Sequence, residues 1–278
     1  MDIFEYLSRF SLPLPGQVKG LVSFDFDGTL FSDTWTCTER IRLFDLLINL
    51  REKGIIWGIN TGRNLPYLGE GIREMFQGVA KAFAPDFLIT MERHVHLRKG
   101  EFLVSDIDWN NRCDDAHEAL FRHHGAMLDS LLADLEFEFS EYQLSRQEGD
   151  VYSLVVNDAV CMDAVAEKID NVIAPYPEIV TQRAFVYLRF SHKDFNKGTA
   201  LRHLVRYFGL DPRTVVIFGD GHNDLDAMAA LPEAYCCCPS NAVSEVRQAV
   251  GKSGGFVSQH SALTGVLEGL ELGVLPRI

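Results

Sequence analysis

The segment SFDFDGTLF at residues 23–31 places two carboxylates, Asp25 and Asp27, two positions apart at the end of an apolar run. Asp and Gly often punctuate turns, so this pair alone is weak evidence for a site. Gly28 permits a sharp bend, however, so that one carboxylate can face a ligand while the other lies beside it. Asp25 could then attack a phosphorus atom, while Asp27 could protonate the leaving oxygen and later deprotonate water.

Two further apolar runs, at residues 55–60 and 214–219, also end in polar residues. Because ligands of an open α/β sheet bind at the carboxyl ends of its strands, we expect the side chains at these ends to share one site. The polar and small residues that follow the two runs are Thr61, Gly62, Arg63, Asp220, Asn223 and Asp224.

The expected site combines carboxylates that could bind a metal ion with groups that could bind a phosphate. Neighbouring carboxylates repel each other, and Asp25 with Asp220 offers the oxygen ligands that Mg²⁺ prefers. Lys197, the Thr61 hydroxyl and the backbone N–H groups near Gly62 would hold phosphate oxygens. Lys197 taken alone would be read as a solvated helix residue. Arg63 could serve either its own loop or a substrate.

The elements around these residues indicate an α/β domain with a parallel sheet. The runs at 20–24, 55–60 and 214–219 have the composition of buried parallel strands. Helical patterns at 38–54 and 196–209 alternate with them, each closed by a glycine. Residues 1–15 are expected to form a short helix and a proline-containing lead-in.

The middle of the chain predicts a smaller, inserted α+β domain. We expect a helix over 110–135 and another over 158–174. Strands are expected at 137–146 and 151–157, paired across a turn at Gly149–Asp150, and a second strand pair at 178–191. The predicted division is a core at 1–107, the insert at 108–190 and the rest of the core at 191–278.

Four segments of the chain resemble the motifs of the haloacid dehalogenase (HAD) superfamily, in their usual order. They are DFDGTL at 25–30, TGR at 61–63, NKGTAL at 196–201 and GDGHNDLDAM at 219–228. The insert resembles the type IIB cap of the sugar-phosphate phosphatase branch, which includes sucrose-phosphate phosphatases. The resemblance implies a Rossmann-like core with an α+β cap. It also implies an Mg²⁺-dependent phosphatase of a small phosphorylated metabolite, such as a sugar or polyol phosphate, that works through a phospho-aspartate.

The resemblance also implies a role for each matching residue. Asp25 matches the nucleophile and Asp27 the acid/base, whose main-chain carbonyl would be a metal ligand. Thr61 and Lys197 match the phosphate clamp. Asp220 matches the acidic metal ligand, with Asn223 and Asp224 around it. The segment at 239–250 is similar to the family's Asn-Ala segment after the fourth motif. Candidate substrate contacts in or near the cap are Arg93, Arg189 and His192.

Some residues depart from the pattern. Relatives commonly carry a small or glycine-containing loop where Met91, Glu92 and Arg93 stand here. His222 replaces a small residue and is either a substrate contact or a surface residue. The cysteines at 236–238 fit buried thiols. Four histidines look like metal-site material but lack a clear third ligand in the sequence. They are His94, His96, His123 and His124.

Other function classes fit less well. The cap of a phosphomutase usually lies between the first two motifs, and residues 31–54 leave room there for one helix. A P-type ATPase needs membrane helices and typically has Thr where Asp27 stands. A receiver module would gain nothing from an acid/base at Asp27. A binding-only relative would more often lack one of the motif residues.

Composition excludes several partners. The formal charge of −13 over 278 residues, without a Lys/Arg cluster, argues against a nucleic-acid partner. No apolar run approaches the roughly 20 residues that span a bilayer. The acidic N-terminus lacks the features of a signal peptide, so a cytoplasmic protein is expected. Six cysteines without CxxC spacing give no zinc motif.

Overall fold

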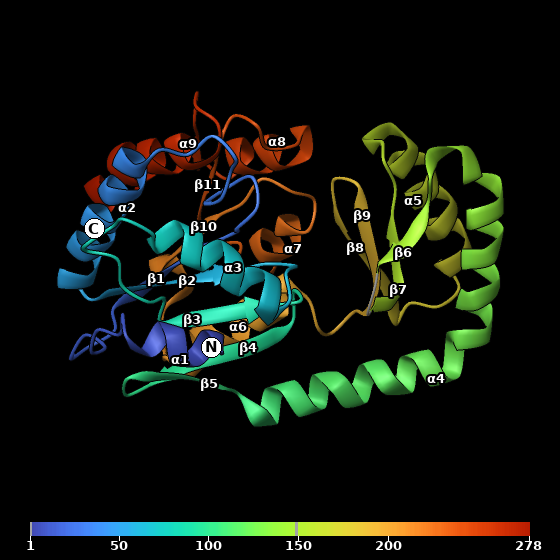
Figure 1. The fold of residues 1–278 in the computed structure, drawn as a ribbon, viewed down its shortest axis with the longest axis horizontal. Helices are drawn as coiled ribbons and strands as arrows, with labels where there is room; N and C mark the ends of the chain where they lie inside the picture. The colour runs from blue at the N-terminus through green and yellow to red at the C-terminus, as the bar shows by residue number, and fades with distance from the viewer. Residues whose placement is uncertain (1, 148–149) are drawn as a thin grey trace.

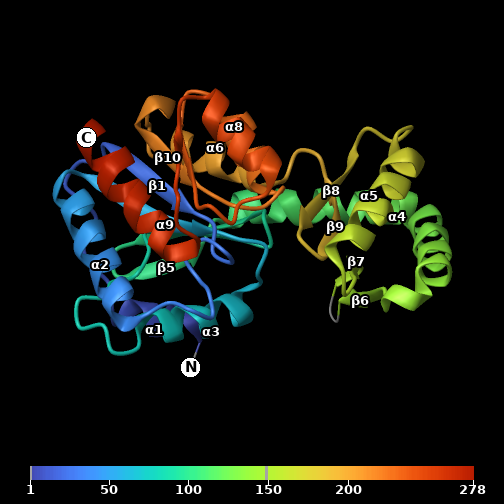
Figure 2. The same cartoon turned by 90° about the horizontal axis from the view of Figure 1, so that it is seen from above.

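A computed structural model, which describes residues 2–147 and 150–278, shows two units, each built around its own β-sheet (Figure 1). The larger unit has an eight-stranded sheet in the order β12-β11-β10-β1-β2-β3-β4-β5. The smaller has a four-stranded sheet in the order β6-β7-β9-β8. Both chain ends lie on the larger unit (Figures 1 and 2). The α/β core with an inserted α+β cap is therefore the architecture of this chain.

The core sheet is mostly parallel. Its parallel strands are β1 (Gly20–Phe24), β2 (Ile55–Asn60), β3 (Phe87–Thr90), β10 (Val215–Phe218), β11 (Tyr235–Cys238) and β12 (Phe256–Val257). β4 (His94–Lys99) and β5 (Phe102–Ser105) add an antiparallel edge. In the central register, Val22 pairs with Trp57 on one side and Val216 on the other. All five residues of β1 are buried, as expected of a central parallel strand.

Helices cover both faces of this sheet. Side chains on one face of the strands pack against one set of helices, and side chains on the other face pack against another set. Phe24 and Trp57 belong to the same buried cluster as α2 and α9, whereas Leu21 and Ile56 belong to the one with α6 and α8. The helices of the core are α1 (Ile3–Ser8), α2 (Cys37–Glu52), α3 (Leu65–Phe76), α6 (Lys197–Tyr207), α7 (Asp224–Ala230), α8 (Ser244–Lys252) and α9 (Ala262–Glu268). The core also has short helical turns, η2 (Pro212–Thr214) before β10 and η3 (Gly269–Val274) and η4 (Leu275–Arg277) after α9. The alternation of strand and helix that the sequence predicted is confirmed.

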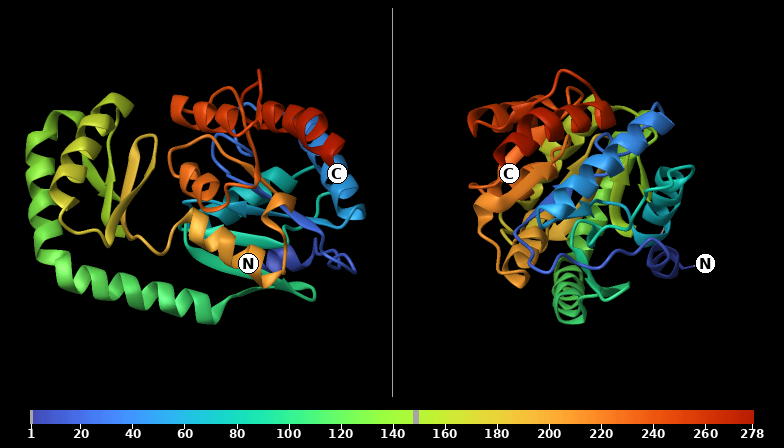
Figure 3. Two further views of the ribbon diagram at one scale, coloured as in Figure 1. Left: turned by 180° about the vertical axis from the view of Figure 1, so that it is seen from behind. Right: turned by 90° about the vertical axis from the view of Figure 1, so that its left-hand side faces the viewer.

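The cap follows the predicted order of helix, two strands, helix and two strands. Its elements are α4 (Ile107–Glu138), η1 (Ser140–Tyr142), β6 (Ser145–Gln147), β7 (Asp150–Val155), α5 (Ala159–Ile173), β8 (Ile179–Ala184) and β9 (Tyr187–His192). α4 runs from the core toward the cap and then bends along the outer side of the cap (Figure 1). Seen from behind, the cap stands beside the core, and α4 runs along the lower edge from the core to the far side of the cap (Figure 3).

One prediction about the cap is wrong. The expected strand over 137–146 is mostly helical, because α4 continues to Glu138 and η1 follows, leaving only Ser145–Gln147 as a strand. Leu128, Leu132 and Leu135 recur at helical spacing and are buried, whereas Phe137 is 86% exposed. The alternation in LEFEFS therefore did not report a sheet face. The glycine of the predicted turn, Gly149, lies outside the described residues.

The predicted boundary at residue 108 falls inside α4. Trp109, in the first turn of this helix, packs in the buried cluster of the core with α6. Leu120 and Leu128, farther along, pack in the cluster of the cap. The helix is therefore shared between the two units. Within the described part of the chain, no helix is both long and apolar enough to cross a bilayer.

Candidate active site

The carboxyl ends of β1, β2, β3 and β10 open into a cavity of about 780 Å³, which the β8–β9 hairpin of the cap lines from the other side. Asp25 and Asp27 lie at the end of β1, and Thr61 to Arg63 lie after β2. Asp220 and Asn223 come from the loop between β10 and α7. The structure thus brings together the strand ends that the sequence predicted to share a site.

A fully buried lysine lies at the base of this site. Lys197, the first residue of α6, places its Nζ 2.5 Å from Asp25 Oδ1 and 2.8 Å from Asp224 Oδ1. A buried ammonium group is stable only when it is paired in this way. Burial alone would lower the pKa of Lys197, but the carboxylates of Asp224 and Asp25 outweigh that effect and raise it. Lys197 is therefore a permanent positive charge beside Asp25.

Asp220 is held by neutral donors from distant segments. The hydroxyl of Thr29 donates to its Oδ1 at 3.0 Å, and the amide of Asn241 donates to its Oδ2 at 3.0 Å. Gly28 has a φ of +75°, and a Cβ built on it would lie 2.2 Å from Asp220 Oδ2. Glycine is therefore required here both for the backbone conformation and for the close approach of the carboxylate.

Three carboxylates meet at one point in the site. Asp25, Asp220 and Asp224 each offer an oxygen, and these atoms lie within 4.8 Å of one another. Burial raises the pKa of Asp220 to about 7, with the charge of Asp224 adding to the effect. Burial also raises the pKa of Asp25, against the opposing charge of Lys197. A single ammonium group does not balance this charge, so the donor set fits a divalent cation with oxygen ligands.

Asp27 and Arg63 form a two-pronged ion pair at the rim of the cavity. Nε of Arg63 donates to Oδ2 of Asp27 at 2.8 Å, and Nη2 donates to Oδ1 at 2.5 Å. The guanidinium carbon also lies 4.9 Å from the ring centres of Phe26 and Phe31. In this structure, Arg63 orients Asp27 and also lines the cavity, so its expected contact with a substrate stays a prediction.

The loop after β2 is joined to the loop after β3. The backbone N–H of Glu92 donates to the carbonyl of Thr61 at 2.9 Å, and that of Met91 donates to the carbonyl of Arg63 at 2.9 Å. The hydroxyl of Thr61 accepts from the N–H of Arg63 at 3.1 Å. In the loop after β10, the carboxylate of Asp224 accepts from the N–H groups of Asp220 and Gly221. Hydrogen bonds to backbone groups therefore fix the shape of all three loops.

Three residues near the site had no role predicted from the sequence. Thr29 and Asn241 hold Asp220, and Glu92 is buried against Asn223. Each carried a signal that points to its position. Thr29 lies inside the first motif, and Asn241 belongs to the Asn-Ala segment. Glu92 stands in the loop that departs from the usual pattern of relatives.

The cap contributes an apolar wall with one cation. Among its lining residues, Phe185 lies at the tip of the β8–β9 hairpin with a φ of +50°, and Arg189 lies on β9. Nη1 of Arg189 donates to the carbonyl of Met91 at 3.3 Å. Arg93 and His192 do not line this cavity. Of the three candidate substrate contacts, the structure therefore brings only Arg189 to the site.

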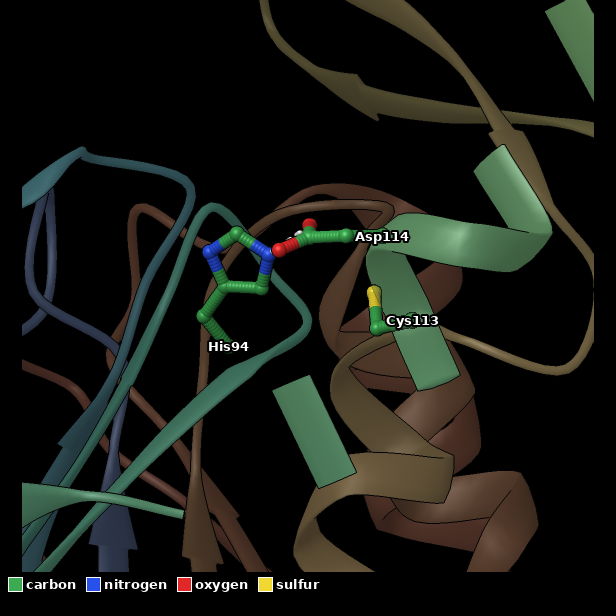
Figure 4. A group of neighbouring side chains, drawn as sticks. All are labelled: His94, Cys113 and Asp114. Atoms are coloured by element: carbon green, nitrogen blue, oxygen red, sulfur yellow. Dashed lines mark hydrogen bonds and ion pairs between the residues drawn. The ribbon is translucent and has the colours of Figure 1, made fainter. Parts of the chain in front are cut away.

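One of the histidines does meet further ligand atoms. The Nε2 of His94 lies 2.8 Å from Asp114 Oδ1, and Cys113 is next to them, where α4 passes β4 (Figure 4). The sequence did not bring these residues together. Burial raises the pKa of Cys113 to about 12, although Arg93 opposes the effect. Burial also lowers the pKa of His94, and the charge of Arg93 adds to this lowering. Because this guanidinium disfavours a second cation, we interpret the group as a hydrogen-bonded contact between α4 and β4.

Other histidines and the cysteines that the sequence analysis singled out make contacts typical of structural residues. His96 bonds to Thr90 and Ser105, and His124 bonds to Glu178 at 2.7 Å. The Nε2 of His222 lies 3.8 Å from Glu245. The cysteines of β11 are buried, and burial raises the pKa of Cys236 to about 11. A thiol with such a pKa is unreactive at neutral pH, as expected for a packing residue.

Comparisons with known proteins agree with this geometry. The model of the haloacid dehalogenase-like hydrolases matches residues 131–269. This chain belongs to that family. Over 226 residues it is 21% identical to a candidate phosphatase of Streptococcus pyogenes, covering 73% of this chain and 81% of the relative. Over 63 residues it is 38% identical to a candidate phosphatase of Haemophilus influenzae, so that match covers only 23% of either protein.

Solved structures share the fold of this family member at low sequence identity. The sucrose-phosphatase of Synechocystis, solved with sucrose and phosphate, has a TM-score of 0.65 and 17% identity over 91% of this chain and 96% of its own. A haloacid dehalogenase-like hydrolase of Bacillus subtilis has a TM-score of 0.63 and 14% identity over 98% of both chains. A sugar phosphatase of HAD subclass IIB has a TM-score of 0.54 and 18% identity over 92% of this chain and all of its own. The predicted type of core and cap is thereby confirmed.

Proposed function

We propose that this hydrolase is an Mg²⁺-dependent phosphatase that acts on a small phosphorylated metabolite, a sugar or polyol phosphate, through a phospho-aspartate at Asp25. The observation that carries the proposal is the contact of Asp25 with the buried ammonium group of Lys197, 2.5 Å away, beside Asp220. This contact holds an anionic nucleophile in place at the base of the cavity and supplies positive charge for a phosphate.

In the first step, the Asp25 carboxylate attacks the phosphorus and the bond to the ester oxygen breaks. Asp27 gives its proton to the leaving alkoxide, which departs as an alcohol. Arg63 holds Asp27 through both carboxylate oxygens. Each of these oxygens keeps a further lone pair, so the guanidinium orients Asp27 without blocking proton transfer.

In the second step, Asp27 takes a proton from water as the oxygen of that water attacks the phospho-aspartate. The bond between the phosphorus and the Asp25 oxygen breaks, which releases inorganic phosphate and restores the carboxylate. Thr61 and Gly62 line the cavity wall, where the Thr61 hydroxyl and the N–H of Gly62 would hold the phosphate oxygens. Lys197 stays bonded to Asp25 in the free protein and keeps the carboxylate oriented for the next cycle.

The residues that would hold Mg²⁺ are Asp25, Asp220 and Asn223, with the main-chain carbonyl of Asp27. Asp224 already accepts bonds from Lys197 and from two backbone N–H groups, so it supports this set rather than adding to it. When bound, the metal offsets the repulsion between the carboxylates and the substrate phosphate.

The cavity and the solved relatives support a sugar-sized substrate. A volume of about 780 Å³ lies within the range of pockets for small molecules. Two of the structural neighbours are named as a sucrose-phosphatase and a sugar phosphatase. A phosphomutase is disfavoured, because between the first two motifs the chain holds α2 and its connections but no cap.

The deciding experiment measures phosphate release from a panel of phosphorylated sugars, polyols and nucleotides, with Mg²⁺ and with chelator. We expect metal-dependent release by the wild type and a loss of about 10³-fold or more for Asp25→Asn. Asp25→Asn should still unfold cooperatively, because Lys197 keeps its bond to Asp224. Mass spectrometry after an acid quench should find the phosphoryl group on Asp25.

Retained turnover in a folded Asp25→Asn protein would contradict the phospho-aspartate mechanism. Release that persists in chelator would contradict the role of the metal. Tight phosphate binding without release from any compound would instead support a binding-only relative.

A further inference from the structure

Glu92 is a buried carboxylate on a strained turn beside the proposed catalytic groups. Glu92 is only 1% exposed to solvent. Met91 and Glu92 both have positive φ values, 50° and 63°. Non-glycine residues in this region are strained and persist only where surrounding contacts hold them. The two backbone bonds from this turn to the loop after β2 supply such contacts.

The side chain of Glu92 contacts one residue of the proposed metal set. Its Oε1 accepts from Nδ2 of Asn223 at 2.8 Å. A carboxylate only accepts hydrogen bonds, so it must face the NH₂ group of the amide. The amide oxygen of Asn223 is thereby turned the other way, toward Gly221, on which a Cβ would lie 2.7 Å from that oxygen.

Gly62 makes room for this arrangement. A Cβ built on Gly62 would lie 3.1 Å from Oε1 of Glu92, which is tighter than most contacts of this kind. Glu92, Gly62 and Asn223 all line the same cavity. The glycine of the TGR segment therefore leaves room for Glu92 as well as for a phosphate.

We propose that Glu92 is a positioning residue: it fixes the amide of Asn223 so that the oxygen, rather than the NH₂ group, is presented to the Mg²⁺ site. This inference rests on the proposed function, because it concerns the metal of that reaction. Partners that orient metal ligands in this way are typically worth 10- to 100-fold in metal affinity or activity.

The first test compares Mg²⁺ binding by calorimetry, without substrate, in the wild type and in Glu92→Gln. A glutamine amide can either accept from or donate to Asn223, so it no longer imposes one orientation. We expect the Kd for Mg²⁺ to rise about tenfold. Glu101→Gln, at the exposed turn between β4 and β5, removes the same charge away from the cavity and should leave the Kd unchanged.

Glu92→Asp separates charge from orientation. It keeps the carboxylate but withdraws it by one methylene, out of reach of the bond that is 2.8 Å long in the wild type. We expect it to weaken Mg²⁺ binding as Glu92→Gln does. Wild-type affinity in Glu92→Asp would show that only the charge matters and would overturn the proposal.

A double-mutant cycle with Asn223→Ala tests whether Glu92 acts through Asn223. The effect of Glu92→Gln on the Kd for Mg²⁺ should disappear in the Asn223→Ala background. An equal effect in both backgrounds would overturn the proposal. So would an unchanged Kd combined with a raised KM, because Glu92 would then be a substrate contact.

The proposed function and the role of Glu92 would fail in different ways. If the wild type binds no Mg²⁺ and releases no phosphate, the proposed function fails and the inference fails with it. If the wild type binds Mg²⁺ and folded Glu92→Gln binds it equally well, only the role of Glu92 fails. Cooperative thermal unfolding of each variant confirms that the measurement reports on a folded protein.

Discussion

At the residue scale, the site depends on close approaches that only certain side chains allow. Gly28 and Asp220 are the clearest pair, because a Cβ at residue 28 would lie 2.2 Å from the carboxylate oxygen. The same oxygen accepts a bond from Asn241 at 3.0 Å, and Asn241 also donates to the carbonyl of Gly28 at 2.9 Å. A Cβ at residue 28 would therefore push Asp220 out of its bond with Asn241.

We expect Gly28→Ala to displace Asp220 and to lower Mg²⁺-dependent phosphate release by about 100-fold, because a catalytic group misplaced by about 1 Å can cost that much. The control is Gly100→Ala. Gly100 has a similar φ of +64° but nothing within 4 Å of the added Cβ. Both variants should lose roughly 1–2 kcal/mol of stability from the positive φ, measured by urea unfolding. Equal loss of activity in both would show that backbone strain, not contact with Asp220, is responsible.

At the element scale, two segments connect the cap to the core, and one histidine joins them. His117, on α4, donates from Nδ1 to the carbonyl of Cys113 at 2.7 Å. Its Nε2 accepts from the N–H of His192 at 3.2 Å and lies 2.9 Å from the hydroxyl of Ser191, both at the end of β9. The neutral ring thus satisfies partners on both connections, and a proton on Nε2 would remove its ability to accept. Burial lowers the pKa of His117 to about 4, and the nearby charge of Arg93 adds to this.

This contact predicts a pH dependence of stability. The folded pKa of about 4 lies below the unfolded value of about 6.5, so the unfolded state takes up a proton first as the pH falls. The stabilisation is complete above pH 6.5 and is lost progressively down to pH 4. From pH 7.5 to pH 5.0, His117 should account for a loss of about 2 kcal/mol in the free energy of unfolding.

The measurement is urea unfolding of the wild type and of His117→Gln at both pH values. His96, whose pKa burial also lowers to about 4, contributes to both proteins. The difference between their pH dependences therefore isolates His117. Parallel pH dependences in the two proteins would refute the prediction.

At the scale of the whole molecule, the site exists only between the two units. The core supplies the charged groups at the ends of its parallel strands, and the cap supplies the apolar wall on the opposite side. Phe185, 41% exposed, projects from the β8–β9 hairpin into this space. Under the proposed function, the core would carry out the reaction and the cap would select the substrate, as in enzymes where a lid covers the substrate.

We expect Phe185→Ala to lower kcat/KM about tenfold for the best sugar phosphate, equivalent to about 1.4 kcal/mol, because an aromatic contact with the substrate is lost. Hydrolysis of acetyl phosphate, which is too small to need the cap, should change less than twofold. Phe137→Ala removes the same ring from the cap at an 86% exposed position of α4 and should change neither activity. Equal losses for large and small substrates would contradict a specificity role for the hairpin.

Local patterns in the sequence were enough to predict three central strands of the core, at 20–24, 55–60 and 214–219, together with the helices between them and the candidate residues at the strand ends. A buried parallel strand is recognised by a short apolar run of about five or six residues. A helix is recognised by apolar residues that recur about every 3.6 positions. The same reasoning failed at 137–146, where the alternation of Phe and Glu resembled a strand. There, the packing of Leu128, Leu132 and Leu135 within the cap prolonged α4 instead.

Only the tertiary structure decided which of these residues meet. Lys197 and Asp25 are 172 positions apart, and Asn223 and Glu92 are 131 apart, yet each pair shares a hydrogen bond. The approach of Arg189 to the cavity, and the exclusion of Arg93 and His192 from it, depend on how the cap docks beside the core. The physical reason is that periodicity and turn chemistry act over a few residues, whereas such contacts depend on the packing of elements that the sequence pattern does not place relative to one another.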